Sequence, residues 1–86
     1  METIKDLARV INKLKNEKEI DSFLCEILTQ SELNILSKRW RILDMLNNGT
    51  TQREIAKELN VSLCKVTRGA KILKDKNSVI KKYLKG

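Results

Sequence analysis

A helix-turn-helix is indicated by the segment Gln52-Arg-Glu-Ile-Ala-Lys-Glu-Leu-Asn-Val-Ser-Leu-Cys-Lys-Val-Thr-Arg68. Two short helices that meet at a wide angle need a small residue where they cross, and Ala56 supplies it. The turn between them favours Asn or Gly because one residue there tends towards positive φ, and Asn60 suits that position. Four apolar residues are placed to hold the two helices together: Ile55, Leu59, Val61 and Val66. The sequence therefore predicts a helix-turn-helix over residues 51–74.

The side chains not used by this core face outward from the second helix, and their types are unusual for a helix surrounded by solvent. Leu63 and Cys64 would be exposed in its first turn, and Lys65 follows where the helix dipole favours an acid. These choices suit a helix N-terminus that enters a DNA major groove, where small apolar groups meet thymine methyls and Thr67 reaches a base edge. A helical hairpin that only builds a core leaves them unexplained. The predicted DNA-binding residues, including phosphate contacts, are Gln52, Arg53, Ser62, Leu63, Cys64, Lys65, Thr67, Lys71 and Lys74.

Positive charge is concentrated in the second part of the chain. The 86 residues carry a formal net charge of +7. Residues 1–36 hold seven acids and five bases, whereas residues 37–86 hold four acids and thirteen bases. A basic half beside a near-neutral half favours a polyanion-binding surface joined to a part with another task. A lysine-rich surface that only maintains solubility is the alternative, since charge alone does not separate the two.

Composition argues against an enzyme and against a metal site. With no His, the chain has neither a Ser-His-Asp or Cys-His arrangement nor a His-ligated zinc. Cys25 and Cys64 stand apart, in no C-x-x-C motif, which predicts reduced thiols. Because no run of 18 apolar residues and no signal-peptide pattern is present, we expect a cytoplasmic protein with no membrane partner. A chain of this size buries little surface, and a second copy is the expected source of further burial.

Apolar residues recur at helical spacing along the chain, and no segment alternates for long as a strand would. Two capping boxes mark helix starts, at Thr29-Gln-Ser-Glu32 and at Thr51-Gln-Arg-Glu54, and Ser62 is a further N-cap. Asn47-Asn48-Gly49 ends the helix that precedes the second box. We expect an all-α chain of six short helices, at residues 4–14, 20–27, 29–46, 51–59, 62–73 and 79–84.

Several pieces of the chain together resemble the tryptophan operon repressor family in residue type, order and spacing. They are Leu28-Thr29, Ser37-Lys-Arg-Trp-Arg-Ile-Leu43, Thr51-Gln-Arg-Glu-Ile55, Val66-Thr-Arg-Gly69 and Leu73-Lys74. The resemblance covers roughly residues 28–74. It implies an intertwined homodimer and a single domain over residues 1–86, with dimerisation helices at 1–46, a helix-turn-helix at 51–74 and a C-terminal helix at 75–86. It also implies a transcriptional repressor that binds a palindromic operator in double-stranded DNA.

The resemblance further implies that L-tryptophan binds as corepressor in a pocket shared between subunits. The indole would lie between Arg39 and Arg68, because a guanidinium plane stacks on an indole face, and Arg68 would also hold the ligand carboxylate. Thr29 would lie close to the ligand ammonium, and Gly69 would leave room for the ligand. Ile72 departs from the family's best-known members, which have a Ser at this position that assists ligand binding.

Two other functions are compatible with the same residues. One is a DNA-binding dimer of this type that responds to another ligand or to none. The other is a recruitment module of the replication-initiator or sigma-factor kind, which uses a similar helix-turn-helix. Individual residues also have structural alternatives, since Thr29 is explained as an N-cap and Arg68 as a phosphate contact.

Overall fold

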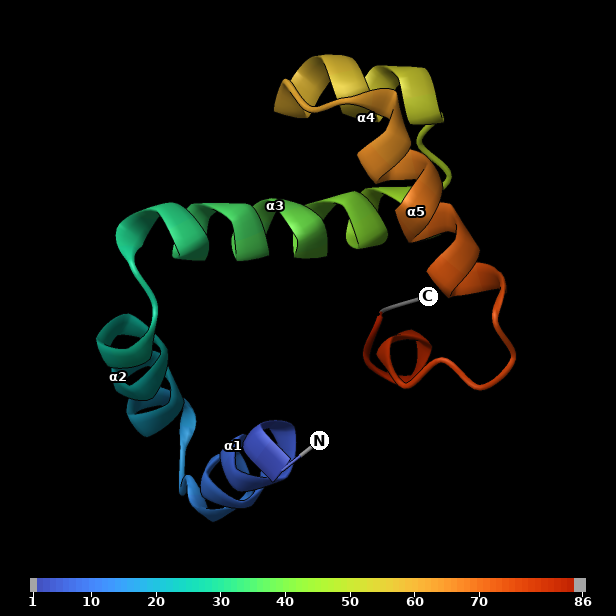
Figure 1. The fold of residues 1–86 in the computed structure, drawn as a ribbon. Helices are drawn as coiled ribbons and strands as arrows, with labels where there is room; N and C mark the ends of the chain where they lie inside the picture. The colour runs from blue at the N-terminus through green and yellow to red at the C-terminus, as the bar shows by residue number, and fades with distance from the viewer. Residues whose placement is uncertain (1, 85–86) are drawn as a thin grey trace. The chain divides into compact units, whose positions relative to one another are not determined.

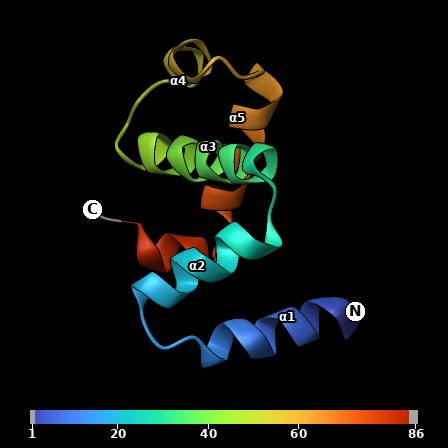
Figure 2. The same cartoon turned by 90° about the vertical axis from the view of Figure 1, so that its left-hand side faces the viewer.

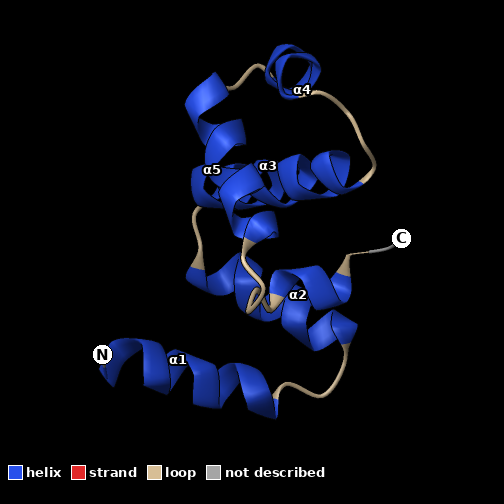
Figure 3. Cartoon of the chain, turned by 90° about the vertical axis from the view of Figure 1, so that its right-hand side faces the viewer, coloured by secondary structure: helices blue, strands red, loops and turns tan. Residues whose placement is uncertain are grey.

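The computed structural model describes residues 2–84, and every regular element in that range is helical (Figures 1 and 3). Five are α-helices: α1 (Glu2–Lys13), α2 (Glu17–Ile27), α3 (Gln30–Asn47), α4 (Gln52–Leu59) and α5 (Leu63–Lys74). The sixth element, η1 (Ile80–Tyr83), is a 3-10 helix. The all-α prediction is confirmed. The prediction of six short helices is wrong in number, and α3 is not short at 18 residues.

The last predicted helix is a 3-10 turn because its sequence lacks what an α-helix needs to begin. Val79, at its N-terminal flank, makes no side-chain capping bond. The element has four residues, too few to offset the cost of nucleating an α-helix.

In the first part of the chain, the capping box predicted at Thr29 and Glu32 is confirmed, whereas α2 begins at Glu17, before the predicted start at residue 20. Asn16 Oδ1 accepts a hydrogen bond from the Glu19 N–H at 2.8 Å and caps α2. At the start of α3, the Glu32 N–H donates to Thr29 Oγ1 at 3.1 Å and the Thr29 N–H donates to the Glu32 carboxylate at 2.8 Å. These two bonds are the reciprocal pair of a capping box.

This capping box makes the stability of the helix start depend on pH. The pKa of Glu32 lies below its ordinary value of 4.5, because the carboxylate accepts hydrogen bonds from Thr29. The bond from the Thr29 backbone has the larger effect, and the bond from the Thr29 side chain has the smaller one. A carboxylate with a lowered pKa stabilises the folded state above its ordinary pKa and loses that effect as the pH falls through the lowered value. We expect Glu32→Gln to lower the melting temperature at pH 7, and the gap to the wild type to be smaller at pH 3, where the carboxylate is more protonated.

Thermal melts followed by circular dichroism test this expectation. Glu26→Gln is the control, since it removes the same charge without removing a capping bond. A melting-temperature gap between Glu32→Gln and the wild type that is the same at both pH values would contradict the role of the carboxylate.

Residues 1–33 and 34–86 form two separate units. The first unit contains α1 and α2, and α2 buries none of its side chains within the chain. Large apolar side chains on both helices are exposed, including Ile4, Leu7, Val10 and Ile11 on α1 and Ile20 and Ile27 on α2. An amphipathic helix normally buries such a face against another element. The first unit by itself therefore leaves this apolar surface uncovered.

The second unit has a small core built where α4 and α5 meet α3. Ile55 and Val66 are completely buried, and Ile42 joins them in one cluster. Five partly buried apolar residues pack against this cluster: Met45, Leu46, Ala56, Leu59 and Val61. The residues predicted to hold the helix-turn-helix together therefore do so, and they also attach it to α3. Figure 1 shows α5 crossing the C-terminal half of α3, and Figure 2 shows α5 passing behind α3.

The turn between α4 and α5 has the predicted left-handed residue. Asn60 has φ 53° and ψ 52°, and its N–H donates to the Ala56 carbonyl, which ends α4. Thr51 Oγ1 accepts from the Glu54 N–H at 3.3 Å at the start of α4. Ser62 Oγ accepts from the Lys65 N–H at 3.4 Å and begins α5.

Substitution of Asn60 tests whether this backbone conformation limits stability. A β-branched side chain is strained at positive φ by roughly 1–2 kcal/mol, whereas Gly adopts the region freely. We expect Asn60→Val to lower the free energy of unfolding by about 1 kcal/mol in urea titrations. Asn60→Gly is the matched control and should stay close to the wild type. Equal free energies of unfolding for Asn60→Val and Asn60→Gly would show that residue 60 does not need the left-handed conformation in the folded protein.

Candidate functional site

The N-terminal end of α5 presents an exposed surface of mixed apolar and basic character. Leu63 is 47% exposed, and Cys64 and Lys65 beside it are also exposed. No acid occupies the first turn of α5. Five further residues of the predicted DNA-binding set are exposed, namely Arg53, Ser62, Thr67, Lys71 and Lys74, and Gln52 is partly buried. The surface combines free apolar groups for a base edge with cations for phosphates.

Two members of this set are bonded to each other, which the sequence analysis did not foresee. The Thr67 hydroxyl lies 3.0 Å from Gln52 Oε1 and 3.0 Å from the Leu63 carbonyl oxygen. A hydroxyl has one proton to donate and two lone pairs that accept. The proton of Thr67 is therefore used inside the motif, and towards a base the hydroxyl acts as an acceptor. The bond also ties the first turn of α4 to α5.

Removal of the Thr67 hydroxyl tests the importance of this link. A typical hydrogen bond within a protein contributes about 1 kcal/mol net. We expect Thr67→Val, which keeps the side-chain shape, to lower the free energy of unfolding by about that amount in urea titrations. Thr67→Ser keeps the hydroxyl and serves as the control. If Thr67→Val is as stable as Thr67→Ser, the link between the two helices has no energetic role.

A pocket lies between α3 and α5, within the second unit. Seven residues line it: Arg39, Ile42, Leu43, Lys65, Arg68, Gly69 and Ile72. Its volume is about 80 Å³. Three of the four predicted tryptophan-binding residues, Arg39, Arg68 and Gly69, are therefore brought together in one place. The fourth, Thr29, belongs to the first unit, where it caps α3.

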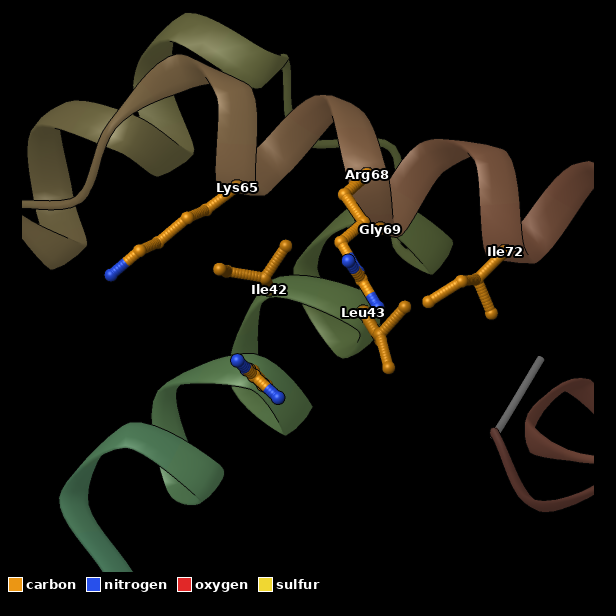
Figure 4. Close-up of a pocket in the computed structure, with 7 residues that line it drawn as sticks. Ile42, Leu43, Lys65, Arg68, Gly69 and Ile72 are labelled. Carbon is orange, nitrogen blue, oxygen red and sulfur yellow. The ribbon is translucent and has the colours of Figure 1, made fainter. Parts of the chain in front are cut away.

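The floor of the pocket is apolar and its walls are cationic. Ile42 is 3% exposed and Leu43 is 5% exposed, so α3 contributes two well-packed aliphatic side chains. Figure 4 shows Arg68 extending from α5 towards these residues. A guanidinium above an aliphatic floor leaves space suited to a flat apolar group with a negative charge at its edge.

Gly69 serves the packing of the two helices. A Cβ atom at this position would lie 3.1 Å from Ile42 Cγ2, 3.3 Å from Leu46 Cδ1 and 3.5 Å from Leu43 Cδ2. The missing side chain thus allows α5 to approach α3 closely. The family resemblance implies that Gly69 leaves room for a ligand. The close packing of α5 on α3 requires a glycine at this position even when no ligand is bound.

Three pocket residues were not predicted from the sequence, namely Ile42, Leu43 and Lys65, whereas the family resemblance had already placed position 72 beside the ligand. Helical spacing could have found them. Residues three or four apart lie on one face of a helix, and the pocket takes positions 39, 42 and 43 from α3 and 65, 68, 69 and 72 from α5. Lys65 was assigned only to DNA, and it belongs to both surfaces.

Other kinds of site are not formed by the residues that the structure describes. Among the side chains that the structure describes, those of residues 4–84, no three His, Cys, Asp or Glu come together as metal ligands. None of the helices described there is long and apolar enough to cross a membrane. Cys25 and Cys64 are free and exposed.

Comparisons with known proteins agree on one family. Residues 2–86 match the model of the family described as Trp repressor protein. The chain is 40% identical over 80 residues to a Trp operon repressor homolog of Xylella fastidiosa (strain M23), covering 92% of this chain and 85% of the relative. A Trp operon repressor homolog of Chlamydia caviae is 32% identical over 81 residues, covering 93% and 80%. One of Chlamydia trachomatis serovar D is 34% identical over 74 residues, covering 85% and 79%. No solved structure matches the chain.

Proposed function

The chain belongs to the Trp repressor protein family, and we propose that it is a sequence-specific DNA-binding transcriptional repressor controlled by L-tryptophan as corepressor. The observation that carries DNA binding is the exposed N-terminal end of α5 on a complete helix-turn-helix. Leu63, Cys64 and Lys65 are free there, while Ile55 and Val66 hold the motif together from inside. The concentration of basic residues after position 36 supplies the attraction to phosphates.

A homodimer is part of this proposal. Reading a palindromic operator requires two recognition helices related by a two-fold axis. The apolar surface to build such a dimer is present, because α1 and α2 leave their apolar faces uncovered and α3 exposes Ile35, Leu36 and Trp40 by 45–47%. A second copy that covers these faces would supply the core that the first unit lacks.

Two features of the pocket support L-tryptophan as the ligand. Arg39 and Arg68 come from different helices and line one space, as a pair that sandwiches an indole ring must. The volume of about 80 Å³ is about half that of an engineered cavity that takes up benzene. One chain therefore forms only part of an indole site, which agrees with a pocket completed by the partner subunit.

Isothermal titration with L-tryptophan, with L-phenylalanine as the comparison ligand, tests the gating. We expect about one L-tryptophan per chain and weaker binding of L-phenylalanine. Arg68→Ala should weaken L-tryptophan binding at least tenfold, because it removes both a stacking surface and a charge-assisted bond. Arg53→Ala is the matched control, since Arg53 lies on α4 outside the pocket. Unchanged L-tryptophan binding by Arg68→Ala would refute this site.

DNA binding is tested by selecting the sequences that the protein binds from a random library of DNA duplexes, with and without L-tryptophan. We expect enrichment of a palindromic sequence only when L-tryptophan is present. Arg53→Ala should weaken binding to the selected duplex. Absence of any enriched sequence in either condition would contradict a sequence-specific repressor.

One observation favours a second candidate, a regulator of the same kind without tryptophan control. Ile72 lines the pocket where a polar residue would assist an amino-acid ligand, so this part of the lining is apolar. A folded dimer that gives no heat with L-tryptophan, yet enriches a palindromic sequence without it, would establish this candidate in place of the first.

A further inference from the structure

The outer face of α5 is distinct from the face that lines the pocket. Leu63, Thr67 and Lys71 are exposed and follow each other at four-residue spacing, which places them on one face of the helix. The pocket takes positions 65, 68, 69 and 72 from the same helix. Four residues rise by about 6 Å along the helix axis. Thr67 therefore lies on the outer face, one turn after the exposed Leu63 at the N-terminal end of α5.

The Thr67 hydroxyl already has two partners within the motif. Its oxygen lies 3.0 Å from Gln52 Oε1 and 3.0 Å from the Leu63 carbonyl oxygen, and neither of these oxygens can donate. The one proton of the hydroxyl therefore points to one of these two acceptors. Turning the Gln52 amide over would place its nitrogen, a donor, beside the hydroxyl, and the proton would then go to the Leu63 carbonyl. In both arrangements Thr67 keeps a lone pair for DNA but no proton.

An acceptor on this face can bond directly to few groups of DNA. Phosphate oxygens only accept, and so do O6 and N7 of guanine, N7 of adenine and O4 of thymine. The donors on the major-groove edges are the N6 amino group of adenine and the N4 amino group of cytosine. Every base pair carries one such amino group, on one strand in A·T and C·G and on the other strand in T·A and G·C. A hydroxyl without a free proton thus distinguishes base pairs by the strand on which the amino group lies.

We infer that Thr67 is a specificity-determining residue, which accepts a hydrogen bond from the exocyclic amino group of adenine or cytosine in one base pair of each half-site. The inference rests on the proposed function, because it requires α5 to enter the major groove. A thymine or guanine in the same place would present a carbonyl oxygen to the lone pairs of Thr67, so that neither group gains a hydrogen bond. A·T and C·G are therefore accepted at this pair, and T·A and G·C are disfavoured.

The test begins with selection from a random library of DNA duplexes, using the full chain and its Thr67→Val variant, with and without L-tryptophan. The base pair whose preference is lost in Thr67→Val is the one that Thr67 contacts. In both half-sites, purine then replaces adenine at this pair, or pyrimidin-2-one replaces cytosine, which removes only the amino group. Thr67→Ser keeps the hydroxyl, and Lys71→Met is the matched control because Lys71 is exposed one turn later on the same face. Circular dichroism confirms folding, and Thr67→Ala replaces Thr67→Val if the latter unfolds.

We expect removal of the amino group to weaken binding of the wild type about fivefold, the effect of one hydrogen bond, and to change binding of Thr67→Val by less than twofold. Thr67→Ser should keep the wild-type preference, and Lys71→Met should weaken binding of all duplexes alike. If the selected sequence has no Thr67-dependent pair, or if amino removal affects wild type and Thr67→Val equally, this inference is overturned while the repressor proposal stands. If the wild type enriches no sequence in either condition, both are overturned.

Discussion

The close approach of α5 to α3 at Gly69 is the contact on which the rest of the second unit depends. A Cβ atom there would lie 3.1 Å from Ile42 Cγ2, tighter than ordinary van der Waals contact. Because the side chain is absent, the buried Val66 reaches the same cluster as Ile42 and Ile55. The helix-turn-helix is thereby attached to α3 in one orientation, and the outer face of α5 is presented to solvent. The pocket is a product of the same contact, since it is lined by the two helices that Gly69 brings together.

The two units differ in how they treat apolar surface. The second unit buries Ile42, Leu43, Ile55 and Val66 in a core of its own, whereas the first leaves its amphipathic faces exposed. Charge follows the same division, with the excess of bases after residue 36. A chain whose excess of bases lies in one unit, and whose other unit consists of helices with uncovered apolar faces, can bind a polyanion with one part and another protein surface with the other. This division of roles is what the proposed dimeric repressor requires.

Local chemistry made much of the fold predictable. The capping box at Thr29 and Glu32, the N-caps Thr51 and Ser62, and the left-handed Asn60 all lie where the sequence places them. Each depends on hydrogen bonds or φ preferences within about four residues, so the nearby sequence contains all the information needed. Besides the start of α2, the last helix was an exception. Apolar spacing alone indicated it, without a cap, and the segment forms a 3-10 turn instead.

The candidate site divides in the same way. By itself, the sequence determined the helix-turn-helix and which residues of α5 are exposed. Through the family resemblance it also indicated that Arg39, Arg68 and Gly69 belong to one pocket. Only the tertiary structure decided that Thr67 bonds to Gln52 and that Lys65 lines a pocket with two arginines. These contacts join residues 15 or more positions apart, or residues on different helices. They depend on the angle and separation at which α3, α4 and α5 pack, and side-chain periodicity within one helix contains neither quantity.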